Sequence, residues 1–302
     1  MARASTFRST AARDDYCALY DEAIAQSTVP VKEQDLPTSF GTTHVLEAGD
    51  PDRPPLIALH AKSFSSTMWL PLLPALVATH HVRMIDAVGD LNKSVATRVL
   101  SSRSRVVGWL DEVVGALGLT RTAVVAASIG SWMATMYANA RPARVERLAL
   151  VCPAGIVSRQ YPRWTLSAMT QVAFRPTPEK VTRFYDSMAV AQSRARLHEP
   201  PWRLLAEQFT TGIPGFRTCL DEAKPVLCKT GSLAASRVPV LVIIGEEESL
   251  HDGARMAARF RERLPLARVE LVPRANHLVF IDQQEQVTSL LGAFLADDLA
   301  AR

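Results

Sequence analysis

The chain has 302 residues, of which 48% are hydrophobic and 21% charged, and its formal net charge is +4. This ordinary composition excludes a disordered chain, a collagen-like repeat and a coiled coil, and no apolar run reaches the roughly 18 residues that a membrane span requires. The first residues include arginines but no apolar segment, so we expect no secretory signal, a cytoplasmic location and no membrane partner.

Neither the cysteines nor the charges predict a cofactor or a macromolecular partner. Cys17, Cys152, Cys219 and Cys228 form no C-x-x-C pair and have no zinc-like spacing with histidine, so we expect free thiols and no metal site. There is no P-loop and no G-x-G-x-x-G after the first strand, which argues against a nucleotide cofactor. The densest arginine group, within 255–268, alternates with apolar residues like the solvent face of a helix. We therefore expect a small-molecule substrate, no nucleic acid partner and no particular oligomeric state.

Residues 1–39 are predicted to form an N-terminal extension. Within it, apolar residues at helical spacing over 14–26 predict a packing helix, and we expect the residues before that helix to be frayed. The stretch 43–47, T-H-V-L-E, alternates in polarity, which indicates an antiparallel entry strand or hairpin.

Short apolar runs separated by helix-length segments dominate the rest of the chain. Runs of four to six apolar residues are typical of strands buried on both faces, as in a parallel sheet. The expected strands are 56–59, 82–85, 123–127, 148–151, 240–244 and 269–272. The expected helices are 103–117, 129–139, 253–264 and 283–295. This alternation predicts an α/β fold, with a mostly parallel sheet and helices on both faces.

The strand rhythm is interrupted once, over 156–235. This stretch is rich in aromatic residues and in prolines, which divide it into short helices. We predict that it is an inserted helical lid over the carboxyl edge of the sheet, where open α/β sheets bind their ligands. The core would then consist of 40–155 and 236–302.

The strand that ends at Ala127 runs through Ser128 directly into a helix. The sequence A-A-S-I-G over 126–130 is close to the G-x-S-x-G nucleophile elbow, whose small residues avoid a clash across a strained turn. Such an elbow places Ser128 at a helix N-terminus, where free N–H groups favour a developing oxyanion. The structural alternative is that Ser128 simply caps the helix.

The strand 56–59 ends in His60 and a polar loop. This loop could supply one N–H group of an oxyanion hole, which we assign to Lys62, and Ile129 after the nucleophile would supply the other. We expect the Lys62 side chain to face solvent rather than to attract an anionic substrate, and His60 to have a structural role.

A third segment supplies a candidate general base. The strand 240–244 leads into the acidic loop G-E-E-E-S-L-H-D, and the strand 269–272 leads to His277. The order serine, acid, histidine is that of α/β-hydrolases, in which the histidine takes the hydroxyl proton and the acid orients the ring. The structural alternative is a surface or structural histidine.

Together these segments resemble the α/β-hydrolase superfamily, and within it bacterial carboxylesterase-like proteins. The resemblance runs from about residue 40 to the end of the chain. It rests on the loop after His60, the D-A-V-G-D segment 86–90, the N-K-S segment 92–94, the Ser128 elbow and Asn276-His277.

The resemblance implies that the acid lies three residues after the glycine that closes the penultimate strand. That position is Glu248, and Asp252 is the reserve candidate. The chain departs from the family pattern where glycine is usual, at Ala61, Ala126 and Ser131. Each departure adds a Cβ near the expected oxyanion hole.

We therefore predict a serine hydrolase that cleaves an ester, thioester or lactone of a medium-sized apolar molecule through an acyl-enzyme on Ser128. The expected substrate contacts are lid aromatics, namely Trp164, Trp202 and Phe209. Two alternatives remain open: a non-hydrolytic biosynthetic enzyme on the same fold, such as a cyclase, acyltransferase or lyase, and a catalytically inactive small-molecule binding module.

Overall fold

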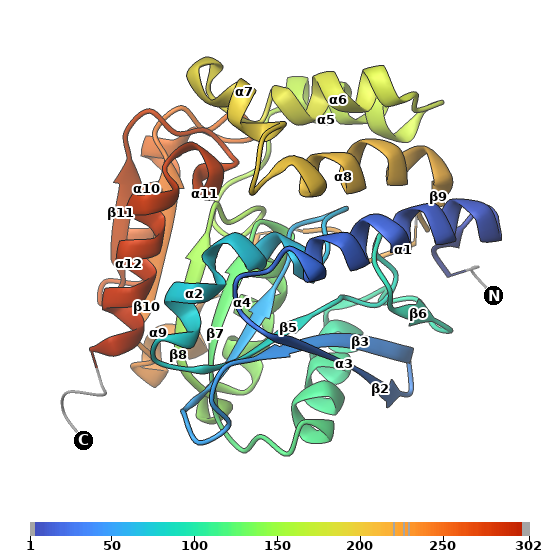
Figure 1. Cartoon of the computed structure of the whole chain (residues 1–302). Coiled ribbons are helices and arrows are strands. Elements are labelled where there is room, and N and C mark those ends of the chain that lie inside the picture. The colour runs from blue at the N-terminus through green and yellow to red at the C-terminus, as the bar shows by residue number, and fades with distance from the viewer. Residues whose placement is uncertain (1–3, 220, 226, 229, 298–302) are drawn as a thin grey trace.

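A mixed β-sheet forms the centre of the molecule (Figure 1). The structure is a computed structural model that describes residues 4–219, 221–225, 227–228 and 230–297. The strand order is β11-β10-β8-β7-β4-β5-β3-β2, and the short strand β6 (Val95–Ala96) pairs with β3. From β5 to β11 along this order, neighbouring strands are parallel, whereas β3 is antiparallel to both β5 and β2.

The six strands predicted from apolar runs are all present, as β4 (Pro55–Leu59), β5 (His81–Ile85), β7 (Thr122–Ala127), β8 (Val145–Val151), β10 (Val240–Gly245) and β11 (Arg268–Val272). β3 (Gly41–Ala48) contains the predicted alternating stretch 43–47, whereas β2 (Val31–Thr38) lies outside every predicted strand. Every residue of β7 and β10 is buried, because both strands lie inside the sheet with helices on both faces. This explains why their sequences are continuous apolar runs without alternation.

Two apolar cores lie on opposite faces of the sheet. One contains side chains from α3 (Arg103–Ala116), α4 (Ile129–Ala140) and α10 (Gly253–Arg263). The other contains side chains from α1 (Thr10–Ala25), α2 (Leu73–Val77) and α12 (Gln284–Ala296). The predicted α/β architecture with helices on both faces is confirmed.

The N-terminal region differs from the prediction in two respects. Among the described residues before α1, β1 (Thr6–Phe7) pairs with β9 (Phe216–Arg217), so this part is not frayed as predicted. The boundary at residue 39 also divides a hairpin, because β2 pairs with β3 along its whole length. β2 is an edge strand with mostly half-exposed or exposed residues, so its sequence carries little of the apolar pattern that marks the inner strands.

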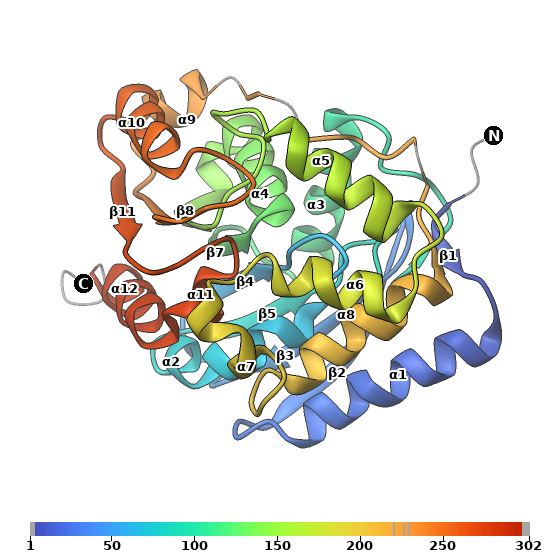
Figure 2. The ribbon, with the colours of Figure 1, turned by 90° about the horizontal axis from the view of Figure 1, so that it is seen from above.

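Between β8 and β10 the chain forms a set of short helices. They are α5 (Pro162–Ala168), the π-helical turn η3 (Met169–Ala173), α6 (Pro178–Asp186), α7 (Arg194–Leu197), α8 (Arg203–Gly215) and α9 (Gly231–Ser236). Figures 1 and 2 show α5 to α8 beyond the carboxyl ends of the parallel strands, with α1 alongside α8. α9 instead packs against α4, so the predicted insertion 156–235 extends past the helices at that edge.

Prolines mark the starts of two of these helices. Pro162 and Pro178 occupy the first helical positions of α5 and α6, where the missing N–H costs no helical hydrogen bond. Within the residues that the structure describes, none of the helices is both long and apolar enough to cross a membrane.

Candidate active site

Ser128 occupies a strained turn between β7 and α4. Its φ of 49° and ψ of −112° lie outside the regions that L-residues ordinarily adopt. The turn brings Gly130 against the end of β4, where a Cβ on residue 130 would lie 2.6 Å from the carbonyl oxygen of His60. Only glycine fits at that distance, which accounts for the second small residue of the elbow. The Ser128 side chain makes no capping bond to α4, which argues against the structural alternative that it merely caps the helix.

The Ser128 hydroxyl belongs to a chain of hydrogen bonds through His277 to Glu248. Ser128 Oγ lies 3.0 Å from His277 Nε2, and His277 Nδ1 lies 2.9 Å from Glu248 Oε2. The side chains of His277 and Glu248 are 5% and 0% exposed. Because an ionised carboxylate only accepts hydrogen bonds, Nδ1 carries a proton, and Nε2 is the acceptor for the serine proton in the neutral ring. This arrangement can remove a proton from Ser128.

The structure separates the two candidate acids. Glu248 accepts from the His277 ring with one oxygen and from the backbone N–H of Leu250 with the other, at 2.8 Å. Asp252 is exposed and caps α10, accepting from the N–H of Arg255 at 2.9 Å. Glu248 is therefore the acid in contact with His277.

His251 lies between Glu248 and Asp252 in the sequence. It is buried, and its Nδ1 lies 3.1 Å from both Ser158 Oγ and the carbonyl oxygen of Arg159. Burial lowers the pKa of His251.

Asn276 connects the loop of the acid to the loop of the histidine. Its Oδ1 accepts the backbone N–H groups of Ser249 and His277, both at 2.7 Å. The backbone N–H of Asn276 donates to Asp282 Oδ2 at 2.8 Å. Burial of the Asp282 carboxyl group raises its pKa. Sequence reasoning noted Asn276 only as part of the resemblance and assigned it no role, because no local pattern reveals a bond to a residue 27 positions away.

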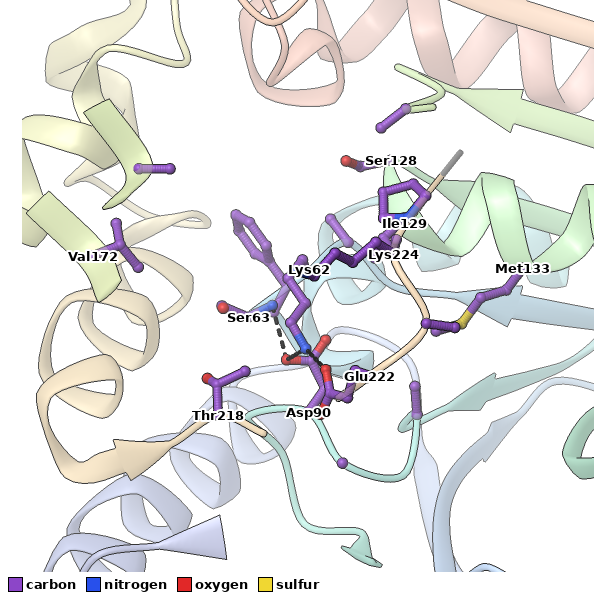
Figure 3. Close-up of a pocket in the computed structure, with 18 of the residues that line it drawn as sticks. Lys62, Ser63, Asp90, Ser128, Ile129, Met133, Val172, Thr218, Glu222 and Lys224 are labelled. Atoms are coloured by element: carbon purple, nitrogen blue, oxygen red, sulfur yellow. Dashed lines mark hydrogen bonds and ion pairs between the residues drawn. The ribbon is translucent and has the colours of Figure 1, made fainter. Parts of the chain in front are cut away.

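The two residues predicted to form the oxyanion hole both line the cavity beside Ser128. Ile129 is the first residue of α4, so its N–H has no acceptor inside the helix. We predicted that the Lys62 side chain faces solvent, but it is instead paired with two carboxylates. Its ammonium lies 2.8 Å from Glu222 Oε2 and 3.4 Å from Asp90 Oδ1, as the dashed lines in Figure 3 mark.

Buried polar residues hold the loop that carries Lys62. His60 is buried, as its predicted structural role requires, and its Nε2 accepts the N–H of Ala87 at 2.9 Å. Asp86 is fully buried and accepts the backbone N–H groups of Ser66 and Lys93 at 2.7 and 3.1 Å. The loops after β4 and β5 are therefore tied together. Asp86 was noted only in the resemblance, without a role.

The departures from the glycine pattern fit the elbow without distorting it. Ser131 Oγ donates to the carbonyl oxygen of Ala126 at 2.7 Å, so this hydroxyl is bonded to the elbow strand. Ala126 is itself fully buried. Ala61 lines the cavity, and its N–H donates to Met68 Sδ at 3.3 Å.

A cavity of about 370 Å³ opens beside Ser128. Most of its wall is apolar and comes from both the core and the helices between β8 and β10. The predicted contacts Trp164 and Phe209 line it, together with Phe64, Met133, Val172, Phe184 and Met188. Figure 3 shows Val172 and Met133 on opposite sides of this space.

Trp202 does not line the cavity, so its prediction as a substrate contact is wrong. It is fully buried, its ring packs 5.6 Å from that of Phe280, and its Nε1 donates to Gln284 at 3.2 Å. An aromatic residue at the start of a helix can face either way, and only the packing of α8 on the core decides which.

No group of three or more His, Cys, Asp or Glu side chains within the described part of the chain is arranged to hold a metal ion. No disulfide joins any of the four cysteines, all of which lie within the described residues. Cys152 is buried at the end of β8, and burial raises the pKa of its thiol.

Comparison with known proteins gives a family model that spans the sites described above. The model named Alpha/beta hydrolase family matches residues 56–290. The chain belongs to the α/β-hydrolase family. Among relatives of this α/β-hydrolase is a Bacillus subtilis (strain 168) protein named "Uncharacterized carboxylesterase nap", 28% identical over 92% of this chain and 91% of the relative. Carboxylesterase YbfK from the same organism is 27% identical over 91% of this chain and 92% of the relative.

Solved structures give the same result for the whole fold. The crystal structure of naproxen esterase (carboxylesterase NP) from Bacillus subtilis matches with a TM-score of 0.86 and 25% identity, over 95% of this chain and 99% of that one. This α/β-hydrolase is therefore carboxylesterase-like, as the resemblance implied.

Proposed function

We propose that this α/β-hydrolase is a serine esterase in which Ser128 is the nucleophile, His277 the general base and Glu248 the orienting acid. The observation that carries the proposal is the hydrogen-bonded chain from Ser128 Oγ through His277 to Glu248, at 3.0 and 2.9 Å. The carboxylesterase relatives support ester hydrolysis as the reaction.

In the first half of the proposed reaction, Ser128 Oγ attacks the ester carbonyl carbon while its proton passes to His277 Nε2. The imidazolium that forms is stabilised by the Glu248 carboxylate. The tetrahedral intermediate then collapses, the C–O bond to the alcohol breaks, and His277 returns the proton to the departing alkoxide. The product of this half is an acyl-enzyme ester on Ser128.

In the second half, His277 removes a proton from water, which attacks the acyl carbonyl carbon. The C–O bond to Ser128 Oγ then breaks and His277 returns the proton to that oxygen, which releases the carboxylic acid and free Ser128. The oxyanion in both halves would accept hydrogen bonds from the backbone N–H groups of Ile129 and Lys62. Ile129 supports this role because it lies at a helix N-terminus, where the N–H groups and the helix dipole both favour negative charge.

The proposed substrate is an ester, thioester or lactone of a medium-sized, largely apolar molecule. The cavity supports this class because its wall near Ser128 is dominated by aliphatic and aromatic side chains, Trp164 and Phe209 among them. In the proposed enzyme α5, α6 and α8 act as a lid that shapes this wall. The first substrates to try are 4-nitrophenyl butyrate and an ester of naproxen, the compound named in the relative from Bacillus subtilis.

Labelling and acylation test the proposal directly. A fluorophosphonate probe should label the wild-type protein on Ser128 and leave Ser128→Ala unlabelled. Mass spectrometry of wild type mixed with 4-nitrophenyl butyrate should find a transient acyl adduct on the same residue. Equal labelling of the two proteins would refute the nucleophile assignment. An adduct that forms but does not turn over in water would favour acyl transfer or cyclisation over hydrolysis.

A further inference from the structure

One end of the cavity is charged, unlike the rest of its wall. Lys62, Asp90 and Glu222 come from three distant parts of the chain and all line the cavity. Figure 3 shows the Lys62 side chain extending away from Ser128 to the two carboxylates. One ammonium shared by two carboxylates leaves the cluster with one net negative charge.

Hydrogen bonds from other residues fix the two carboxylates of the cluster in position. Asp90 Oδ1 also accepts the N–H groups of Ser63 and Leu91, at 3.0 and 2.9 Å, and its side chain is only 5% exposed. Glu222 Oε1 accepts from Ser5 Oγ at 2.5 Å. These bonds hold both carboxylates in place beside the Lys62 ammonium.

The Lys62 ammonium remains charged at neutral pH. Burial of the ammonium alone would lower the pKa of Lys62, but the charges of Asp90 and Glu222 raise it above its usual value. Lys224 also lines the cavity, but it is exposed, so water and salt screen its charge more strongly than those of the cluster.

Glu222 reaches the cavity across the loop that follows β5. A Cβ on Gly89 would lie 3.2 Å from Glu222 Oε1, and the φ of Gly89 is +86°, so a side chain there would be strained as well as crowded. On the other side, Ser5 Oγ accepts the N–H of Cys219 at 2.8 Å. Ser5 therefore holds both Cys219 and Glu222 at the edge of the cavity.

The charged cluster is close to the proposed oxyanion hole, because the Lys62 ammonium and the Lys62 backbone N–H are separated only by the lysine side chain. Resting on the proposed function, we infer that the Lys62–Asp90–Glu222 cluster selects esters that are neutral or cationic at this end and disfavours esters that carry a carboxylate there. Glu222 is the specificity-determining residue, because removing its charge makes the cluster neutral while Asp90 still pairs with Lys62.

The test compares three 4-nitrophenyl esters of equal chain length: the hexanoate (neutral), the hydrogen adipate (anionic) and the 5-(trimethylammonio)pentanoate (cationic). A second series carries the same three end groups on the alcohol, because either side of the ester can face the cluster. The measured quantity is the ratio of kcat/KM for the anionic and the neutral ester, after subtraction of spontaneous hydrolysis.

Two variants change the net charge of the cluster, and a third removes a hydrogen bond that holds Glu222 without changing any charge. Glu222→Gln should raise the anionic-to-neutral ratio about tenfold, the effect of one unit charge some 10 Å away at an effective dielectric constant of about 20. Lys62→Gln should lower that ratio, because the cluster then has two net negative charges. Ser5→Ala is the matched control: it removes a hydrogen bond that holds Glu222 but leaves every charge, so the ratio should change far less than in Glu222→Gln.

An unchanged ratio in both series for Glu222→Gln and Lys62→Gln would overturn the inference. So would an equal change in Ser5→Ala, which would assign the effect to a loosened segment instead of to charge. The proposed function can fail separately, if wild type hydrolyses no ester at all. In that case the dissociation constants of Ser128→Ala for the 4-nitroanilides of the same acids decide the inference, with weakest binding expected for the anionic one.

Discussion

Replacing Glu248 by glutamine tests the origin of the activity most sharply. The substitution keeps the shape of the side chain but removes the charge 2.9 Å from His277 Nδ1. In the proposed mechanism the imidazolium exists only after Ser128 has lost its proton, so the carboxylate stabilises the transition state more than the resting enzyme. At an effective dielectric constant of about 20, two unit charges at this distance interact by about 6 kcal/mol. That energy corresponds to at most about 10⁴-fold in rate.

We expect Glu248→Gln to lower kcat/KM for 4-nitrophenyl butyrate by about 10²- to 10⁴-fold, because solvent relaxation and the new amide recover part of this energy. Asp252→Asn is the matched control, since it removes a carboxylate from the same loop without touching His277. It should retain at least about half of the wild-type kcat/KM, with at most about 1 kcal/mol of stability lost at the start of α10. A loss below about tenfold in Glu248→Gln, or an equal loss in both variants, would refute the assignment of the acid.

Three other predictions follow from the described contacts. Trp164→Ala should raise KM for an aryl ester about tenfold with little change in Tm, whereas Trp202→Ala should cost about 3–5 kcal/mol of unfolding free energy, because only the first lines the cavity. Denaturant unfolding and KM measured on both variants check this, and a destabilised Trp164→Ala would contradict it. Gly130→Ala places a Cβ 2.6 Å from a backbone oxygen, so the elbow must shift and kcat should fall about 100-fold; an unimpaired kcat would show that the turn has room. Burial, with two nearby arginines, lowers the pKa of His80 from 6.5 to about 4. The unfolded chain therefore takes up this proton first as the pH falls, and stability should drop by about 2–3 kcal/mol between pH 6.5 and 4. His80→Gln should lack that part of the pH dependence, and identical slopes for the two proteins would contradict the pKa shift.

Much of the fold was predictable because its signals are local. The six predicted strands are all present. Five of them lie inside the sheet, where cover on both faces favours apolar residues at most positions, and the edge strand β11 still carries three apolar residues. β2 and β1 were missed because an edge strand and a two-residue strand bury too little apolar surface to leave a pattern. The end of the insertion was also misplaced, because a short helix such as α9 has the same composition whether it packs on the core or beyond the sheet edge.

The elbow at Ser128 and the apolar runs of the α/β class can be read from the sequence because each is a pattern of neighbouring residues, and the order of serine, acid and histidine along the chain can be read by comparing three such local segments. Tertiary structure alone decided which acid meets His277, which tryptophan faces the cavity and what the Lys62 ammonium binds. The reason is physical: Ser128 and His277 are 149 residues apart, and Lys62 and Glu222 are 160 apart. Contacts over such separations exist only once the sheet, its loops and the N-terminal segment have packed together.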